Sequence, residues 1–444
     1  MSLAVLICSF FLFKKASGSM AFSKLNMLSY LFYVPMFAMS FLGAVFIVLK
    51  LDDHYLINKL RYDETRLIGW LAVLYTMIML PAGMLLAKRI FFKGSIQKSF
   101  EHFAQKPVIY LLGKNELILK SILIGLSLFG SLVMIYTFYS IGMVPILEMF
   151  KGNSEELARI RILASREFSG NIYLRNIFAL QFLPLLSFVA FAYYQKSKSL
   201  LDLSWFLITF FSALMILSYD LQKSPMAMFL TGFVFYIVWV NGKIALHKLA
   251  FIVFLFIGII ASFYIGFGNE NIAHIFLSYN TGASGRILFS QLAGTFFSFE
   301  FFDSMKEFIG FNSMSKLVNN FGIEYAERAG RLIMEVINPK GIKEGTAGVQ
   351  NTLFIGEAWA NFGFLGLLLS PVYVGFMIGS LFYTLMRLPK TPLLIGIYVF
   401  FSYKTAIIGG FNDYLYNVST LSVFVLFGLI LIYSSKLSKS ISNE

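Results

Sequence analysis

The sequence predicts an all-α protein that crosses a lipid bilayer many times, and three observations lead to this fold class. Hydrophobic residues make up 58% of the chain and charged residues only 13%, whereas soluble domains carry about a quarter charged residues. The mean hydropathy is +0.75. Apolar runs that can cross a ~30 Å hydrocarbon core recur along the whole chain. No Pro/Ser-rich linker separates them, so we expect a single polytopic membrane domain over residues 1–444.

The apolar runs define about eleven transmembrane helices if each needs about 20 residues. The first run, Met1–Phe13, is short, and it lacks the basic start and small-residue cleavage pattern of a removed signal peptide. We therefore interpret it as a first span. The other spans are expected at about 27–49, 67–87, 117–139, 176–195, 203–219, 225–240, 249–266, 358–385, 391–409 and 418–434.

The connections between these spans are of two kinds. Short, basic connections with few acids are typical of cytoplasmic loops, and they occur at 14–24, 88–115, 196–202, 241–248, 386–390 and 435–444. The remaining connections mix acids with bases and are expected to face outward, at 50–66, 140–175, 220–224, 267–356 and 410–417. The two long outer loops, 140–175 and 267–356, are expected to contain short interfacial helices and to carry the catalytic or binding surface. The net charge of +13 follows from such an orientation, so no nucleic acid partner is predicted.

Arginine and lysine are distributed differently between the two sides. Most lysines lie in the predicted cytoplasmic loops, but of eleven arginines only Arg89 and Arg387 do so. The positive-inside rule alone predicts that arginines, like lysines, lie mostly in cytoplasmic loops. Because a guanidinium presents a planar fork of donors that matches phosphate oxygens, the pattern favours an anionic ligand on the outer side. Ordinary loop charge paired with nearby acids is the alternative. The outer arginines are Arg61, Arg66, Arg159, Arg161, Arg166, Arg175, Arg286, Arg328 and Arg331.

The first long outer loop predicts a short interfacial helix over residues 155–166, which contain good helix formers and no breaker. Arg159 and Arg166 are seven residues apart and would share a face, whereas Arg161 would point elsewhere. Glu155 lies one turn before Arg159 and could hold its side chain.

The second long outer loop contains Arg286 after the flexible segment 280–285. Apolar residues 287–302 follow and could re-enter the membrane, provided that other helices shelter them. Helical spacing of apolar residues over 314–336 predicts helices on the outer leaflet, with Arg328 and Arg331 on the polar side. A partly solvated packing helix is the alternative.

Three further ionisable residues lie at the outer ends of spans. Lys404 is late in an outward-going span and Lys223 is in a tight outer turn, so both could meet a lipid phosphate or simply extend to the interface. Glu357 opens the span that follows the polar stretch 350–356. It could act as a general base or pair with an arginine.

Several chemistries have no sequence basis. Cys8 is the single cysteine, and the histidines show no HExxH spacing. Neither a P-loop nor a GxGxxG motif after a strand is present. We therefore predict no metal and no cofactor.

These features resemble the Wzy family of O-antigen polymerases, which join lipid-linked oligosaccharide repeat units. The resemblance lies in the order of the features along the chain and in their common location on the outer side. The resemblance covers about two thirds of the chain. It consists of the loop entry Gly142–Pro145, Arg159 followed by Gly170, the turn Gln222–Pro225, the second arginine-bearing loop, and Asn351–Gly366.

The resemblance implies a GT-C-like glycosyltransferase that acts at the periplasmic face of the bacterial inner membrane. Its donor and acceptor would both be undecaprenyl-pyrophosphate-linked oligosaccharides, beside membrane lipid and a possible chain-length-regulating co-polymerase. An O-antigen ligase, or a flippase or other transporter, remains an alternative. The expected catalytic residues are Arg159, Arg161, Arg166, Arg286 and Glu357, and the expected substrate-binding residues are Arg175, Lys223, Arg328, Arg331, Asn351 and Lys404.

Overall fold

The computed structural model describes residues 1–149, 160, 162, 164, 167–266, 276–280, 282–344 and 346–443. In these ranges every regular element is a helix. The long helices, in chain order, are α1 (Ser2–Ser17), α2 (Met27–Leu31) continuing through η2 (Phe32–Phe41) into α3 (Leu42–Val48), α4 (Asp63–Phe91), α6 (Glu116–Ile141), η5 (Arg175–Phe182) continuing into α10 (Leu183–Ser197), α11 (Leu200–Leu217), α12 (Lys223–Asn241), α13 (Leu246–Gly266), α19 (Phe354–Arg387), α20 (Pro392–Lys404) and α22 (Val418–Asn443).

Nine helical segments among the described residues are long and apolar enough to cross a membrane, which confirms a polytopic α-helical membrane protein. They are Ser2–Lys24, Met27–Val48, Asp63–Phe91, Glu116–Ile141, Ile172–Ser197, Leu200–Leu217, Lys223–Asn241, Phe354–Arg387 and Asn412–Tyr433. Two more apolar helical stretches, Leu246–Leu255 within α13 and Pro392–Lys404, are shorter. Each predicted span therefore overlaps a helix.

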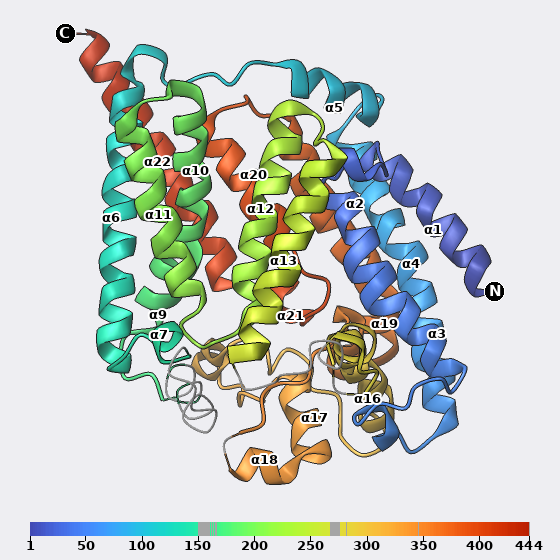
Figure 1. The fold of residues 1–444 in the computed structure, drawn as a ribbon. Helices are drawn as coiled ribbons and strands as arrows, with labels where there is room; N and C mark the ends of the chain where they lie inside the picture. Colours follow the sequence, from blue (N-terminus) through green and yellow to red (C-terminus); the bar gives the residue numbers. More distant parts are fainter. Residues whose placement is uncertain are drawn as a thin grey trace.

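The helices run up and down, so their connections gather at two opposite ends of the bundle (Figure 1). One end carries α5 (Ile96–Gln105) and the C-terminus, and we call it the α5 end. The other carries the cap, which we define as residues 276–280, 282–344 and 346–353. Short elements in or beside the cap are α7 (Pro145–Met149), α9 (Ile172–Leu174), α15 (Ala283–Gly285), η6 (Arg286–Ser290), α16 (Ala293–Phe301), η7 (Lys316–Phe321), α17 (Ala329–Ile337), α18 (Pro339–Lys343) and α21 (Asn412–Leu415).

Helices α4 and α19 form a close pair because glycine lets each backbone approach the other. A Cβ at Gly83 would lie 2.1 Å from the Val372 carbonyl oxygen, and a Cβ at Gly375 would lie 2.0 Å from the Leu80 carbonyl oxygen. Small residues at contact positions are the usual means of close helix packing in membranes, where lipid offers no hydrophobic driving force. This pair forms the rigid side of the bundle on which α16 and the cap rest.

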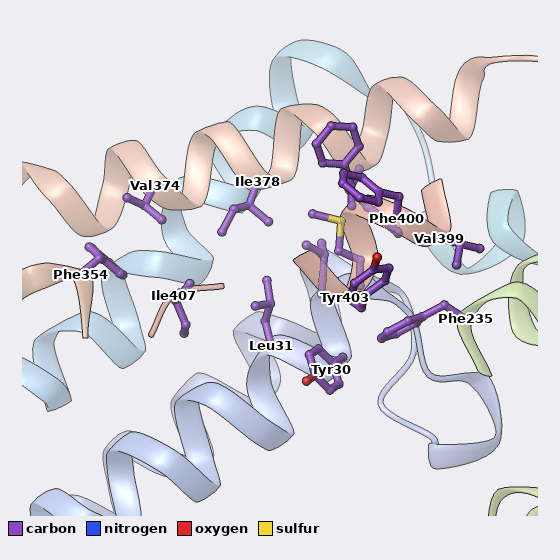
Figure 2. Close-up of a cluster of buried hydrophobic side chains, with 14 of the residues drawn as sticks. Tyr30, Leu31, Phe235, Phe354, Val374, Ile378, Val399, Phe400, Tyr403 and Ile407 are labelled. Atoms are coloured by element: carbon purple, nitrogen blue, oxygen red, sulfur yellow. The ribbon is translucent and has the colours of Figure 1, made fainter. Parts of the chain in front are cut away.

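Aromatic and aliphatic side chains fill the space between α2, α12, α19 and α20 (Figure 2). Tyr30, Phe235 and Val399 are among the buried residues there. Near the α5 end the rings of Trp239 and Tyr398 stack at 3.5 Å between centroids. Helices α10 and α12 contact α20, and so do α2 and α19. This core therefore joins the two sides of the bundle.

One spanning helix is interrupted. Within α19, Gly363 has φ 57° and ψ −136°, a backbone conformation that favours glycine and breaks the helix. The carbonyl oxygens just before the break accept hydrogen bonds from the cap: Ile309 N–H donates to Ala360 at 3.0 Å and Gly310 N–H to Asn361 at 2.9 Å. Buried backbone groups need such partners. The break thus anchors the cap to the bundle.

The predicted helices of the second outer loop are found in part. Residues 287–302 form the end of η6 and the short α16, which is buried against α4 and α19, as a re-entrant segment requires. The helical pattern over 314–336 yields η7 and α17, and α17 buries Ala329, Gly330 and Ile333. Tyr325 lies between these two elements, outside either helix.

Candidate functional site

The cap is joined to α19 by a bidentate ion pair between Arg328 and Glu357. Arg328 precedes α17, and Glu357 is in the first turn of α19. Arg328 Nε donates to Glu357 Oε1 at 2.8 Å and Arg328 Nη2 to Oε2 at 2.9 Å. The Asn412 N–H donates to the same Oε2 at 2.8 Å. Glu357 is only 2% exposed, so both carboxylate oxygens are engaged and shielded.

Arg328 also bonds a second carboxylate. Its Nη1 donates to Asp413 Oδ1 at 3.0 Å, and 34% of the side chain remains exposed. Burial by itself would lower the pKa of Arg328, but the hydrogen bonds and charges of Glu357 and Asp413 raise it above its ordinary value. The guanidinium is therefore a fixed cation with part of its donor fork facing outward.

Gly410 makes room for this pair. A Cβ there would lie 1.6 Å from Arg328 Nη2 and 2.3 Å from Glu357 Oε2. The segment that carries Gly410 is held to the start of α19 by backbone bonds, from Phe354 N–H to Ile407 O at 3.0 Å and from Gly409 N–H to Thr352 O at 2.8 Å. A side chain at position 410 would displace the guanidinium.

Beneath the ion pair lies a buried amide and hydroxyl network that the sequence did not single out. Asn361 Nδ2 donates to Asn412 Oδ1 at 2.8 Å, and Asn412 Nδ2 donates to Ser313 Oγ at 2.9 Å. All three side chains are buried. The sequence signal for this network was the pair Asn412 and Asp413, which follows two glycines. These polar residues can reach α19 only if the 410–417 loop folds back.

The predicted substrate-binding residue Asn351 belongs to a polar segment of the cap that bonds to the end of η6 and the residue after it. Asn351 Nδ2 donates to Gln291 Oε1 at 2.9 Å, and the neighbouring Gln350 Nε2 donates to Ser290 O at 2.9 Å. Asn351 itself is exposed. Arg331, in α17, donates from Nη1 to Ala347 O at 3.3 Å. Both residues therefore stabilise the cap and still border solvent.

Arg286 begins η6 and is exposed, and it lies close to a histidine that the sequence did not highlight. His54 is buried, its Nδ1 accepts from Leu56 N–H at 3.3 Å, and its Nε2 lies 3.3 Å from Ser290 Oγ. Burial, followed by the charge of Arg286, lowers the pKa of His54 to about 4.

This histidine is not arranged to activate Ser290. Because Nδ1 accepts a hydrogen bond, the proton of the neutral ring is assigned to Nε2, which then donates toward the serine. A general base would need a free lone pair on Nε2. The pair is thus a neutral hydrogen bond that holds η6 to the 49–62 loop beside Arg286.

Arg175 lies on a different side of the same end and is only 5% exposed. Its Nη1 donates to Ala164 O at 3.0 Å, and its guanidinium lies over the rings of Phe168 and Tyr219, at 4.3 and 5.0 Å. It therefore connects Ala164 and Phe168 with Tyr219, in the turn between α11 and α12. A direct phosphate contact would require this guanidinium to leave its ring partners.

The other predicted arginines of this loop, Arg159, Arg161 and Arg166, lie outside the described residues. Their described neighbours Ile160 and Ala164 are helical and buried. Ile160 packs with Leu221 and Met226, at the α11–α12 turn and the start of α12.

Two predicted lysines end on this side of the bundle. Lys223 begins α12 and is half-buried. Lys404 ends α20 and is exposed, with Nζ 6.0 Å from the Phe400 ring centroid. The 13 residues of α20 rise only ~20 Å, less than the ~30 Å core. No described carboxylate lies within ion-pair distance of Lys404.

The structure thus sorts the predicted residues into two groups and one separate cation. Arg286, Arg328, Arg331, Asn351 and Glu357 belong to the cap and its junction with α19, whereas Arg175 and Lys223 flank the α11–α12 turn. Lys404 lies apart, at the end of α20.

No three His, Cys, Asp or Glu side chains in the described ranges are arranged to hold a metal ion. The prediction of a reaction without a metal or cofactor stays a prediction. Comparison of the chain with protein-family models, with curated proteins and with solved structures finds no match.

Proposed function

We propose that this protein joins lipid-linked oligosaccharide repeat units by glycosyl transfer at the cap end of the bundle. The observation that carries the proposal is the placement of guanidinium groups at one end of a polytopic bundle. There, Arg328 is fixed on a partly exposed side chain, and Arg286, at the start of η6 in the same cap, is exposed. The sequence resemblance to O-antigen polymerases supplies the chemistry for that surface.

In the proposed reaction, an acceptor hydroxyl on the terminal sugar of a new lipid-linked repeat attacks the anomeric carbon of the growing chain. The bond from that carbon to the pyrophosphate of the carrier breaks, with inversion, and the hydroxyl proton passes to a base or to water. Negative charge develops on the leaving pyrophosphate. Arginines that are already positioned would stabilise it at no reorganisation cost. Arg159, Arg161, Arg166 and Arg286 are proposed for this role.

Glu357 takes a positioning role in this scheme. Both of its oxygens accept hydrogen bonds from Arg328 and Asn412, so taking a proton from an acceptor would require the ion pair to open. Arg328 is proposed to bind substrate phosphate together with Arg331 and Asn351. At the α11–α12 turn, a separate phosphate contact is proposed for Lys223 and, once its guanidinium leaves its ring partners, for Arg175. Lys404 is proposed to meet the carrier phosphate nearest the lipid.

The proposal includes the finer topology. We propose eleven spans, with the α5 end in the cytoplasm and the cap in the periplasm of a bacterium, because basic connections are typical of the cytoplasmic side. Donor and acceptor are both undecaprenyl-pyrophosphate-linked, and a chain-length-regulating co-polymerase is the expected protein partner.

A transporter is the second candidate, because the break in α19 is of a kind found at transporter binding sites. Such sites use unwound carbonyls to hold ions. Here the carbonyls of Ala360 and Asn361 are already bonded to Ile309 and Gly310, which favours the enzyme. An O-antigen ligase would share the donor and the topology, and differ only in passing the glycan to lipid A core.

The test is to incubate the purified protein in nanodiscs with lipid-linked repeat units alone, without nucleotide sugar, and to resolve the products by gel. A ladder of lengthening products supports the polymerase. Intact substrate that is consumed only after lipid A core is added identifies a ligase. Intact substrate in both cases, with movement between leaflets in sealed vesicles, identifies a transporter and refutes the proposal.

A further inference from the structure

The α5 end contains a basic cavity that the proposed reaction does not use. It lies between α5 and the last turn of α19, and its volume is about 400 Å³. Four of its lining residues carry basic or imidazole groups, and no carboxylate lines it in the described part of the chain. The lining residues are Phe92, Lys98, Ser99, His102, Phe103, Lys106, Met386 and Arg387.

The basic residues are brought together by helix geometry. Lys98 and His102 are four residues apart on one face of α5, and Lys106 is the extended residue that directly follows the helix. They line the same cavity as Arg387, the last residue of α19. All four are exposed, so their charge is available to a ligand.

The nearby carboxylate of α5 is used elsewhere. Glu101 accepts a hydrogen bond from Lys24 at 3.1 Å, on another side of the helix from the cavity. Like charges crowded around a cavity without an acid repel each other, and an anion would relieve that repulsion.

The helix that carries the site is held firmly in place. Lys390, only 3% exposed, donates from Nζ to Ala104 O at 2.9 Å, Lys106 O at 3.0 Å and Val240 O at 2.7 Å. This cation also offsets the negative end of the α5 dipole, which would otherwise oppose an anion beside Lys106.

We propose that this cavity binds the phosphate headgroup of an anionic membrane lipid. Two observations favour a lipid over a soluble phosphate. Phe92, Phe103 and Met386 give the cavity an apolar wall that suits acyl or glycerol carbons. The cavity also opens at the end of spanning helices α4 and α19, where bilayer headgroups lie.

Native mass spectrometry of the full chain in detergent tests the proposal. We expect one saturably bound phosphatidylglycerol, no retained phosphatidylcholine, and binding at least about tenfold weaker in the double variant Lys106→Gln/Arg387→Gln, because each basic group near an anionic surface contributes about fivefold. Lys243→Gln/Lys248→Gln removes the same charge from exposed residues of the same end that do not line the cavity, and should leave affinity within about twofold.

Two further measurements test whether the cavity binds the lipid specifically. Lys98→Glu, on an exposed helix face, should weaken binding without disturbing the fold, and equal weakening in both double variants would overturn the proposal. Inorganic phosphate should compete at least tenfold more weakly than the lipid; competition at equal affinity would overturn the lipid assignment. None of these outcomes depends on glycosyl transfer, so they are separate from the test of the proposed function.

Discussion

The two ends of the bundle hold their cations in different ways. In the cap, Arg328 is bonded to two carboxylates and Arg331 to a backbone carbonyl. At the α5 end, Lys390 is buried against carbonyls, while Lys106 and Arg387 line a cavity without a described acid. The cap's arginines therefore build structure as well as present charge. A substitution there tests stability and function together, whereas exposed cations of the α5 end can be changed with little effect on the fold.

The largest expected difference between the ends is in activity. Arg159→Ala or Arg166→Ala should abolish chain extension while leaving protein in the membrane, because both residues are proposed to stabilise the leaving pyrophosphate. Arg159→Lys should also impair extension, since a point charge cannot replace a bidentate fork. The product ladder measures each variant.

Arg89 is an exposed arginine at the end of α4, at the α5 end of the bundle. Arg89→Ala is therefore the matched control and should keep full activity. Full-length glycan from both alanine variants would refute the assignment, and normal turnover by the lysine variant would reduce it to simple charge.

The next largest effect should follow from Glu357→Ala. Loss of this buried carboxylate leaves Arg328 and Asn412 without their partner, and we expect a loss of about 3 kcal/mol, at the low end for a buried pair because Arg328 is partly exposed. Thermal unfolding and limited proteolysis of the cap measure the loss. Glu344→Ala removes an exposed carboxylate 3.8 Å from Lys340 and should change stability by less than about 0.5 kcal/mol. Equal effects from the two variants would contradict the structural role of the pair.

A pH dependence should be confined to the cap end. The pKa of His54 is lowered to about 4 in the fold, against about 6.5 when unfolded. The unfolded chain therefore takes up the proton first as pH falls, so stability is complete above pH 6.5 and declines toward pH 4. Between pH 7.5 and 5 the loss should be about 2 kcal/mol.

The measurement is the difference in melting temperature between wild type and His54→Gln at each pH. That difference should narrow or reverse as pH falls, whereas His102→Gln, exposed at the α5 end, should track wild type throughout. A difference between wild type and His54→Gln that stays constant with pH would refute the role of this histidine.

The smallest of these effects is expected for Lys390→Met, at the α5 end. The change removes the donor shared by several carbonyls and should cost about 1–2 kcal/mol, with faster hydrogen exchange in α5. Lys106→Met, at the exposed residue that directly follows α5, should cost less than about 0.5 kcal/mol. Unchanged exchange in α5 of the Lys390 variant would show that other contacts hold that helix.

The sequence was sufficient for the spans because a bilayer demands long apolar helices, and hydropathy records that demand directly. It also allowed Glu357 to pair with an arginine, but it could not say which one, since Arg328 lies 29 residues away in the chain. His54 and Ser290 are 236 positions apart. Such contacts depend on how the cap folds back, which local periodicity does not encode. The break at Gly363 was missed for the same reason, because the loop amides that satisfy it come from residues 309 and 310.

The reciprocal glycine contacts of α4 and α19 limit how this protein can move. Sliding one helix along the other by a turn would bring the side chain of Met79 or Ala87 to the place of Gly83, against a carbonyl that only glycine now admits. The two helices are therefore expected to keep a fixed register. If the proposed reaction requires a rearrangement, we expect displacement of the α10–α13 side relative to the α4–α19 pair.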